Sequence, residues 1–390
     1  MMRSGQVTFV NAEAGSPVRV AGARIAAAFG AGARDDDLLI DLQGDRLLPG
    51  LINSHDHLQL NHLPPLPEAS HCSNAREWIA QVNLHRHSDP DFAAHVSVAL
   101  SERLLMGGMK NLLSGVTTVA HHDPLYGALR DEGFPVRVVE NYGWSHSLYI
   151  DGEQTVRSSC WSTPLSSPWI IHAAEGVDAE ARGEFDRLEA LGCLRPNTVL
   201  VHGVALDAAR RARLQQAGAG LIWCPASNLR LFGTTIEVSE LARHGCVALG
   251  TDSRLSGSVD LLCELRVART AGAVDEEVLE SMVTRNAATL LKLPDRGRLE
   301  AGALADLLVL PAGMALSGAR RADIRLVMIG GRPLYADPDY ARLLAPPTHW
   351  AAIQVDGRAK MLEANLAGEI NAVMIGEPGV SIPDLSWRAA

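Results

Sequence analysis

The chain has 390 residues, 47% of them hydrophobic, so it can bury a large core, and a disordered or fibrous protein is excluded. Its 35 basic and 45 acidic residues give a net charge of −10, which repels phosphate backbones and anionic lipids and argues against a nucleic-acid partner. The six cysteines show no C-x-x-C spacing, and no apolar run has the length of a signal-peptide core or a membrane span. We therefore expect a cytoplasmic protein with reduced thiols and no membrane partner.

The two ends of the chain share a pattern of short apolar stretches separated by turn residues. The pattern runs through V-T-F-V-N and V-R-V-A-G-A-R-I near the start and returns in A-D-L-L-V-L and I-R-L-V-M-I-G-G-R-P-L-Y near the end. It is typical of small antiparallel strands. We predict one β-sandwich domain from residues 1–48 and 299–340, with residues 341–390 as a C-terminal extension packed on the sandwich or on the central domain.

Residues 49–298 alternate strand-like apolar runs with sequence rich in Ala, Arg and Glu that is typical of helices. This alternation predicts parallel β/α units, and polar residues at strand ends are typical of a (β/α)₈ barrel. The predicted fold class is therefore α/β, with a distorted (β/α)₈ barrel as the central domain.

The spacing of the strand ends tests this prediction. One barrel unit takes roughly 30 residues, and the steps from His172 to Asp252 fit that length. The interval 122–172 is too short for three full units, so we predict a trimmed middle in which the existence of strand four stays open. The first connection, from His57 to Val116, is overlong and is predicted to lie over the barrel mouth as a lid.

An apolar run ends in the sequence S-H-D-H, which places His55 and His57 two residues apart. Side chains two apart on a strand share a face, so both imidazoles can point into a barrel. With 14 histidines in the chain, this pair alone fits chance as well as a metal site. Three further predicted strands also end in such residues: His172, His202 and Asp252. Five polar residues at the same end of successive strands indicate a metal centre.

These motifs make the chain similar to the amidohydrolase superfamily, in particular to its cytosine deaminase, guanine deaminase and triazine hydrolase branch. The matching stretches, in the family's order, are L-P-G-L-I-N-S-H-D-H, H-A-A-E, V-H-G, W-C-P-A-S-N-L-R-L-F-G, A-L-G-T-D-S and N-A-A-T-L-L-K-L-P-D-R-G-R-L-E-A-G-A-L-A-D-L-L-V. The resemblance implies a distorted barrel, a β-sandwich built from both chain ends and one divalent metal. It implies His55, His57, His172 and Asp252 as ligands, with Glu175 and His202 handling the water and the substrate.

The lysines bear on the number of metal ions. Binuclear members of the superfamily need a bridging carbamylated lysine on a middle strand, and the sequence has no lysine between Lys110 and Lys292. We therefore expect one metal ion. Three imidazoles and a carboxylate suit Zn²⁺, with Fe²⁺ or Mn²⁺ as alternatives.

A divalent metal lowers the pKa of bound water from about 15.7 to roughly 7. Asp252 can then take the proton of the water, and His202 can stabilise charge at the attacked carbon. Glu175 reaches such a site only if the chain turns after Ala173; otherwise it is an acidic residue before the next helix. A carboxyl group there can protonate a leaving amine, which chloride does not need, so Glu175 favours deamination over dechlorination.

Candidate substrate contacts follow several of the strand ends. They are Gln59, Trp144, Asn228, Arg230 and Ser253. Turn and helix-start roles explain Asn228 and Arg230 equally well, and core packing is the stronger explanation for Trp144.

The sequence thus predicts a metal-dependent hydrolase that deaminates a small nitrogen heterocycle such as a pyrimidine, a purine or a triazine-like ring. Hydrolysis of a ring C–N bond, or of a chloro or alkylamino substituent, is the alternative within enzymes. A non-catalytic amidohydrolase-like scaffold is the alternative of another class. The expected partner is a small-molecule substrate, and a homodimer stays an open alternative to a monomer.

Overall fold

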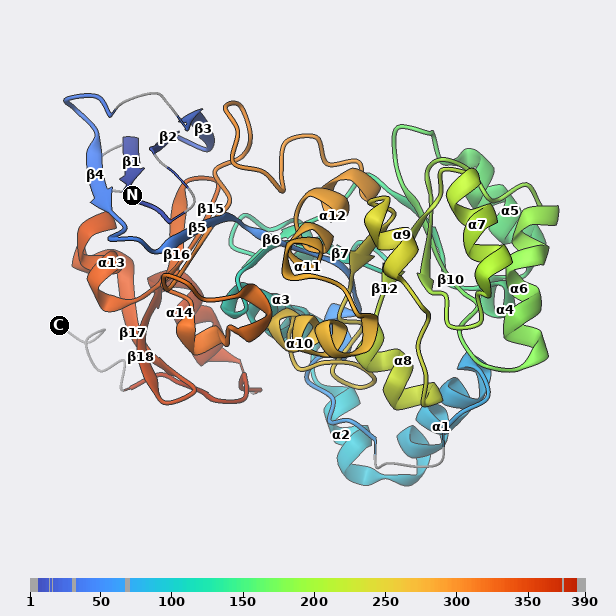
Figure 1. The fold of residues 1–390 in the computed structure, drawn as a ribbon. Helices are drawn as coiled ribbons and strands as arrows, with labels where there is room; N and C mark the ends of the chain where they lie inside the picture. Colours follow the sequence, from blue (N-terminus) through green and yellow to red (C-terminus); the bar gives the residue numbers. More distant parts are fainter. Residues whose placement is uncertain are drawn as a thin grey trace.

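The computed structural model describes residues 6–13, 15, 17–29, 33–66, 71–373 and 375–383. Both chain ends, blue and red in Figure 1, form a β-rich part that lies beside an α/β part built from the middle of the chain. Within the described ranges, every helix is too short or too polar to span a bilayer.

Eight parallel strands of the described chain form the barrel, and they pair in chain order as two sheets, β6-β7-β8 and β9-β10-β11-β12-β13. A bridge between Asp56 and Asp252 brings the first strand next to the segment after the last one. The predicted α/β class with a distorted barrel is therefore confirmed. The strands are β6 (Leu51–Asp56), β7 (Val116–His121), β8 (Arg137–Val138), β9 (Gly143–Ser145), β10 (Trp169–Ala173), β11 (Thr198–His202), β12 (Gly220–Trp223) and β13 (Val247–Leu249).

The middle of the barrel is trimmed, as the spacing predicted. Strands β8 and β9 have two and three residues, and residues 139–142 alone connect them. The two strands do not pair with each other, so the ring of hydrogen bonds is interrupted there. A strand at the fourth position exists, but it is short.

Side chains alternate between the inside and the outside of the barrel, as the period of a strand requires. On β10, Ile170 belongs to an inner apolar cluster and Ile171 to the outer one. Ala287 and Ala288 of α12 (Arg285–Leu290) join the inner cluster. The other inner members include Ile52, Ala120, Val199, Val201, Ile222 and Ala248. The barrel is therefore a packed core, and the polar residues that follow the strands gather at their carboxyl ends.

Helices follow most of the strands and cover the outside of the barrel (Figure 1). They are α3 (Leu100–Leu113), α4 (Leu148–Asp151), α5 (Glu153–Ser162), α6 (Ala179–Ala190), α7 (Ala208–Gln216), α8 (Pro225–Phe232), α9 (Ser239–Arg243), α10 (Leu261–Gly272) and α11 (Glu276–Met282).

The long first connection contains η1 (Leu58–Leu60), α1 (Ala75–Ser88) and α2 (Pro90–Ser97), and the two α-helices project together from the barrel (Figure 1). The start of α1 reaches the loop after β10, because Asn74 forms a bridge with Gly176 and its amide donates to Asp178 at 2.6 Å. The overlong connection therefore contacts the barrel mouth, as predicted; its opening and closing as a lid stays a prediction.

Two sheets form the β-rich part, with strand orders β3-β2-β1-β4 and β19-β17-β18-β16-β15-β14-β5. Apolar side chains of both sheets, such as Phe9, Val20 and Met328, pack into one core. Strand β5 pairs with β14, with Leu48 opposite Leu308, which ties the two chain ends together. The segment after residue 340 supplies β17, β18 and β19 to the larger sheet.

The remaining elements are β1 (Gln6–Val10), β2 (Val18–Ala21), β3 (Arg24–Ala28), β4 (Leu38–Asp41), β5 (Arg46–Pro49), β14 (Leu307–Leu310), β15 (Leu326–Ile329), β16 (Arg332–Ala336), α13 (Pro338–Leu344), β17 (Trp350–Val355), β18 (Arg358–Glu363), α14 (Ala364–Ala372) and β19 (Val380–Ser381), with short 3₁₀ turns η2 (Gly127–Arg130), η3 (Leu316–Gly318), η4 (Arg321–Asp323) and η5 (Pro347–His349).

Candidate metal centre and active site

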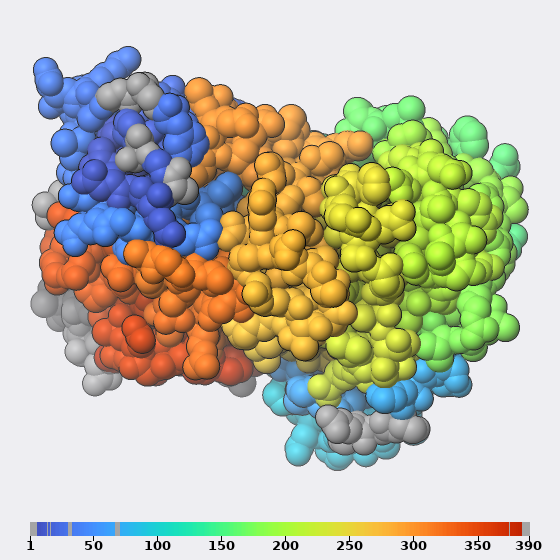
Figure 2. Space-filling model, viewed as in Figure 1, coloured from blue at the N-terminus to red at the C-terminus, as the bar shows by residue number. Residues whose placement is uncertain are grey.

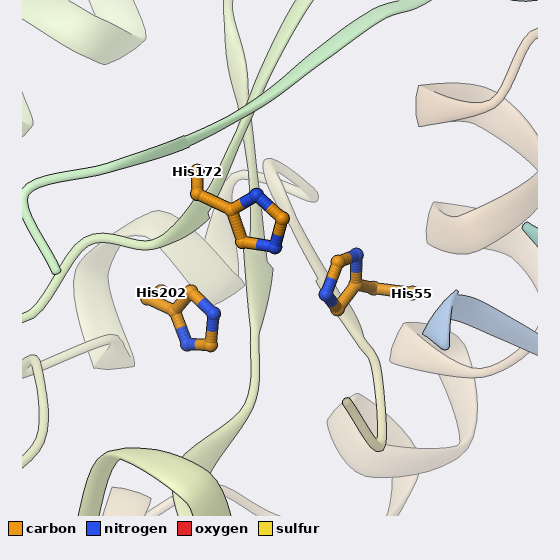
Figure 3. Close-up of side chains that lie close together, drawn as sticks. All are labelled: His55, His172 and His202. Carbon is orange, nitrogen blue, oxygen red and sulfur yellow. The ribbon is translucent and has the colours of Figure 1, made fainter. Parts of the chain in front are cut away.

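The residues that were predicted at the strand ends converge at one place. Within each of two overlapping groups, all ligand atoms lie within 4.8 Å of one another: His55, His172 and His202 in one, and His55, His57 and Asp252 in the other. The rings of His55, His172 and His202 come from separate strands and point toward a shared space (Figure 3). These buried side chains form a histidine-rich metal site.

The distances fit one cation. Tetrahedral ligand atoms at 2.0–2.1 Å from zinc lie about 3.3 Å apart. The His57 Nε2 atom lies 3.4 Å from His172 Nε2 and 3.8 Å from Asp252 Oδ1. The His55 Nε2 atom lies 3.9 Å from the same Asp252 oxygen, and it is buried without a hydrogen-bond partner. A buried polar atom without a partner is costly unless an ion or another group satisfies it.

Hydrogen bonds at the far side of each ring fix which nitrogen faces the site. The Nδ1 atom of His57 lies 2.6 Å from an Asp123 carboxylate oxygen, and the Nδ1–H of His172 donates to the His146 carbonyl at 2.8 Å. His122 donates from Nε2 to the Ser145 carbonyl at 3.0 Å, so its Nδ1 can accept from Nδ1 of His55 at 3.2 Å. In all three metal-site imidazoles Nε2 is thereby left for a metal, which is the usual arrangement of ligand histidines.

The electrostatics favour neutral imidazoles at two of these positions. Burial lowers the pKa of His55 and of His172 well below the usual value, which favours the neutral imidazole. A metal ligand needs this neutral form. Burial also lowers the pKa of His57, but Asp123 outweighs this effect and raises it to about 9. A metal that binds at His57 must therefore displace a proton.

Asp252 follows β13 in a left-handed conformation, with a φ of 54°. Such a conformation costs a non-glycine residue about 1–2 kcal/mol, so neighbouring contacts have to hold it. The hydroxyls of Ser227 and Ser256 both donate to Asp252 Oδ2, at 2.7 and 2.6 Å. This leaves Oδ1 directed at the imidazoles of His55 and His57.

His202 ends β11 with a φ of 73°, and its Nδ1–H donates to the Asn228 side-chain oxygen at 2.9 Å. Its Nε2 lies 3.6 Å from Glu175 Oε1. Glu175 reaches this position because the chain turns after β10, where Ala174 has a φ of 54°. The turn on which the role of Glu175 depended is therefore present.

Burial raises the pKa of the Glu175 carboxyl, His202 counteracts the shift, and the Asp252 carboxylate adds to it. A raised pKa favours the protonated form of a carboxyl group. Glu175 can therefore act as a proton donor beside His202.

The W-C-P-A-S-N stretch positions two of these residues at once. Helix α8 begins at Pro225, directly after β12, and carries Ser227 to Asp252 and Asn228 to His202. Asn228 was predicted to contact the substrate. It lies in the site, but its side chain is buried. Its oxygen accepts from His202, and its amide donates to the Thr235 hydroxyl at 3.0 Å.

The other candidate substrate contacts are dispersed. Gln59 donates to Asp123 at 2.7 Å, and Trp144 lies edge-on to His122 with 5.5 Å between ring centroids. Ser253 is buried next to Asp252. Arg230 is exposed on α8, donates to the Leu66 carbonyl at 3.0 Å and lines a different cavity.

Sequence reasoning assigned no role to Asp123 or His122 and did not place His146 in the metal site. The H-H-D triplet at the end of β7 was the available signal, because polar residues at the carboxyl end of a barrel strand face the site. His146 follows β9, and its ring centroid lies 4.8 Å from that of His172. Its buried Nδ1 has no hydrogen-bond partner.

A buried polar network lies under the site and includes Lys110. This ammonium group is 1% exposed and donates to Asn61 at 2.7 Å, to Thr251 at 3.1 Å and to Asp56 at 3.3 Å. Asn111 also donates to Asp56, at 2.8 Å. The lysine on α3 thus joins the first strand to the segment after the last one.

Comparisons with known proteins show which proteins this chain resembles. The amidohydrolase family model matches residues 164–334. A 5-methylthioadenosine/S-adenosylhomocysteine deaminase of Nitratidesulfovibrio vulgaris (strain DP4) is 30% identical over 366 residues, which cover 78% of this chain and 82% of that protein. An 8-oxoguanine deaminase of Pseudomonas aeruginosa is 31% identical over 189 residues, 41% of this chain and 42% of that protein.

Solved structures share the fold at low identity. An adenosine deaminase from Xanthomonas campestris with bound zinc has a TM-score of 0.68 at 19% identity, covering 87% of this chain and 95% of that one. An atrazine chlorohydrolase from Arthrobacter aurescens TC1, complexed with zinc, has a TM-score of 0.65 at 20% identity, covering 82% and 90%. By the similarity to the Nitratidesulfovibrio protein over most of both chains, together with the family match and the histidine-rich site, this chain belongs to the amidohydrolase family.

Proposed function

We propose that the protein is a zinc-dependent hydrolytic deaminase of a purine-like heterocycle. The observation that carries this proposal is the buried Glu175 carboxyl, 3.6 Å from His202 and beside the convergent histidines. The similarity to a methylthioadenosine/S-adenosylhomocysteine deaminase and to an 8-oxoguanine deaminase supports a purine ring as the substrate class.

In this proposal His55, His57, His172 and Asp252 hold the metal. A bound zinc ion supplies Lewis-acid activation of water, whose pKa it lowers to roughly 7. Asp252 would face the metal with Oδ1, because the hydroxyls of Ser227 and Ser256 donate to Oδ2, and its carboxylate accepts the proton of the attacking water.

His202 stabilises the charge that develops at the attacked carbon, in a tautomer set by Asn228. Glu175 delivers a proton to the leaving amino nitrogen, so that ammonia departs as the carbonyl of the product forms. Over the whole reaction one water adds and one ammonia leaves. One water proton passes to Asp252, the other ends on the ring nitrogen beside the new carbonyl, and the proton gained by Asp252 returns Glu175 to its protonated form.

Dechlorination of a triazine is the second candidate, since an atrazine chlorohydrolase shares the fold. Chloride needs no proton to leave, whereas an amine does, so a buried carboxyl with a raised pKa favours deamination.

The test measures ammonia and chloride release by the zinc-loaded enzyme. The substrate panel contains 5′-methylthioadenosine, S-adenosylhomocysteine, adenosine, 8-oxoguanine, guanine, cytosine and atrazine. We expect ammonia release from at least one purine compound and no chloride release. Chloride release from atrazine without turnover of any purine would overturn the proposal.

The Glu175→Gln variant tests the proton donor separately. It keeps the size of the side chain and removes the titrating proton, so zinc content should stay at the wild-type level while kcat falls by about 10²–10⁴-fold. The matched control is Glu189→Gln on α6, which removes an exposed carboxylate paired with Arg213. A Glu175→Gln variant with wild-type kcat would remove Glu175 from the mechanism.

A further inference from the structure

A second cavity, separate from the histidine cluster, lies where several parts of the chain meet. Its volume is about 590 Å³, and its walls come from the first connection, from α8, from the loop after β13 with α10, and from the segment 320–378. None of the metal-site histidines lines it. The blue-to-cyan segment and the red C-terminal part leave an indentation where they meet at the lower edge of Figure 2.

The lining of this cavity is rich in arginine: Arg230, Arg254, Arg266, Arg320 and Arg321. Two of these five are neutralised. Arg254 pairs with both oxygens of Glu377 at 2.8 and 2.5 Å, and Arg321 pairs with Asp356 and with the same Glu377. The other carboxylate of the lining, Asp260, caps α10 by accepting from the Cys263 amide at 2.7 Å.

The other three arginines form no ion pair with the described residues. Arg230 and Arg266 each donate to a backbone carbonyl, that of Leu66 at 3.0 Å and that of Ala319 at 2.7 Å. Arg320 acts on Asp356 only through its charge, which helps to lower the pKa of that carboxyl, and Asp356 is already paired with Arg321. Within the part of the chain that the structure describes, no carboxylate lies within 4.0 Å of any of the three guanidinium groups. A guanidinium has five N–H donors, so most of their hydrogen-bonding capacity is unused.

Five arginines and two carboxylates, Asp260 and Asp356, line the cavity, so positive charge is in excess there, and the repulsion among the guanidinium groups is stronger near a protein surface than in bulk water. The chain as a whole carries a net charge of −10, so this positive cluster stands against the overall charge. An anion inside the cavity would relieve the repulsion and accept charge-assisted hydrogen bonds from the planar guanidinium groups.

We propose that this cavity binds an oxyanion, a phosphate or a carboxylate group, through Arg230, Arg266 and Arg320. Its volume lies in the range of small-molecule sites, so the anion can belong to a larger metabolite. The site is distinct from the proposed deaminase centre and does not depend on the reaction assigned to it.

The test is a calorimetric titration of the zinc-loaded protein with inorganic phosphate and, separately, with succinate, at constant ionic strength. The variant Arg266→Gln/Arg320→Gln removes two charges from the cavity. The control Arg269→Gln/Arg358→Gln removes two charges from exposed side chains, which are 55% and 67% exposed.

We expect saturable binding of at least one of the two anions to the wild type and to the control, and binding at least about tenfold weaker to the cavity variant. Phosphate binding alone or succinate binding alone identifies which oxyanion the cavity takes. Circular dichroism and zinc content establish that the variants are folded.

Three results would overturn the proposal. Neither anion binds saturably to the wild type, the cavity variant binds as tightly as the wild type, or the control loses as much affinity as the cavity variant. Phosphate held at the metal centre would give the second of these results, because the substitutions leave the histidine cluster intact.

Discussion

Asp123 positions a metal-site histidine, and its removal should weaken zinc binding without unfolding the protein. Its carboxylate lies 2.6 Å from His57 Nδ1 and also accepts from Gln59 at 2.7 Å. Burial acts to raise the pKa of Asp123, but the opposing effect of His57 is larger and the net shift is downward, so the carboxylate is ionised at neutral pH. The carboxylate therefore fixes the ring orientation and raises the basicity of the nitrogen that faces the metal.

The size of the effect follows from the two functions of this contact. Loss of such a partner costs 10- to 100-fold in metal affinity, or about 1.4–2.8 kcal/mol. The variant Asp123→Asn keeps an acceptor oxygen of the same shape and loses only the charge, so we expect a loss near tenfold. Asp123→Ala loses the hydrogen bond as well, so its loss should approach 100-fold.

The assay is competition for zinc between the protein and a fluorescent chelator at neutral pH. Asp339→Asn, which removes a carboxylate that is 84% exposed on α13, is the control. If both Asp123 variants bind zinc as tightly as the control, the contact does not support the metal site and the reasoning fails. Equal losses for Asn and Ala would show that shape, not charge or hydrogen bonding, is what His57 requires.

Three further predictions concern stability. Burial raises the pKa of Glu264 to about 8, so the folded state holds a proton that the unfolded chain releases near the ordinary pKa of 4.5. The free energy of unfolding should therefore fall as the pH rises from 4.5 to 8. The Glu264→Gln variant should reduce this fall by up to a few kcal/mol, as measured by urea unfolding. A wild type with no such slope would contradict this. The Lys110→Met variant leaves the buried Asp56 carboxylate without its cation and should lower the free energy of unfolding by about 3–5 kcal/mol. The double variant Lys110→Met/Asp56→Asn should recover part of this loss. Equal stability of the single and the double variant would refute the pairing. Removal of the metal with a chelator should lower the midpoint of thermal unfolding, and added zinc should restore it, because a ligand that binds only the folded state stabilises that state. A midpoint that does not change with zinc would argue against a resident metal.

The sequence by itself predicted the architecture and the convergence of the histidines. Period-two alternation places His172 on the same face as Ile170, and every parallel barrel strand ends on the same rim. Local pattern therefore suffices to predict that residues at strand ends, such as His55 and Asp252, come together. The trimmed middle also followed from the spacing of the predicted strand ends, since the interval 122–172 is too short for three full β/α units.

Only the tertiary structure revealed which residues hold the site. Asp123 reaches His57 across 66 positions, and Asn228 reaches His202 across 26, through packing of separate strands and of α8 against a strand end. The arginine-lined cavity depends in the same way on the C-terminal segment meeting the first connection. Strand period and spacing are local properties of the chain, whereas these partnerships depend on the distance between side chains after the whole barrel has closed, and no local pattern specifies that distance.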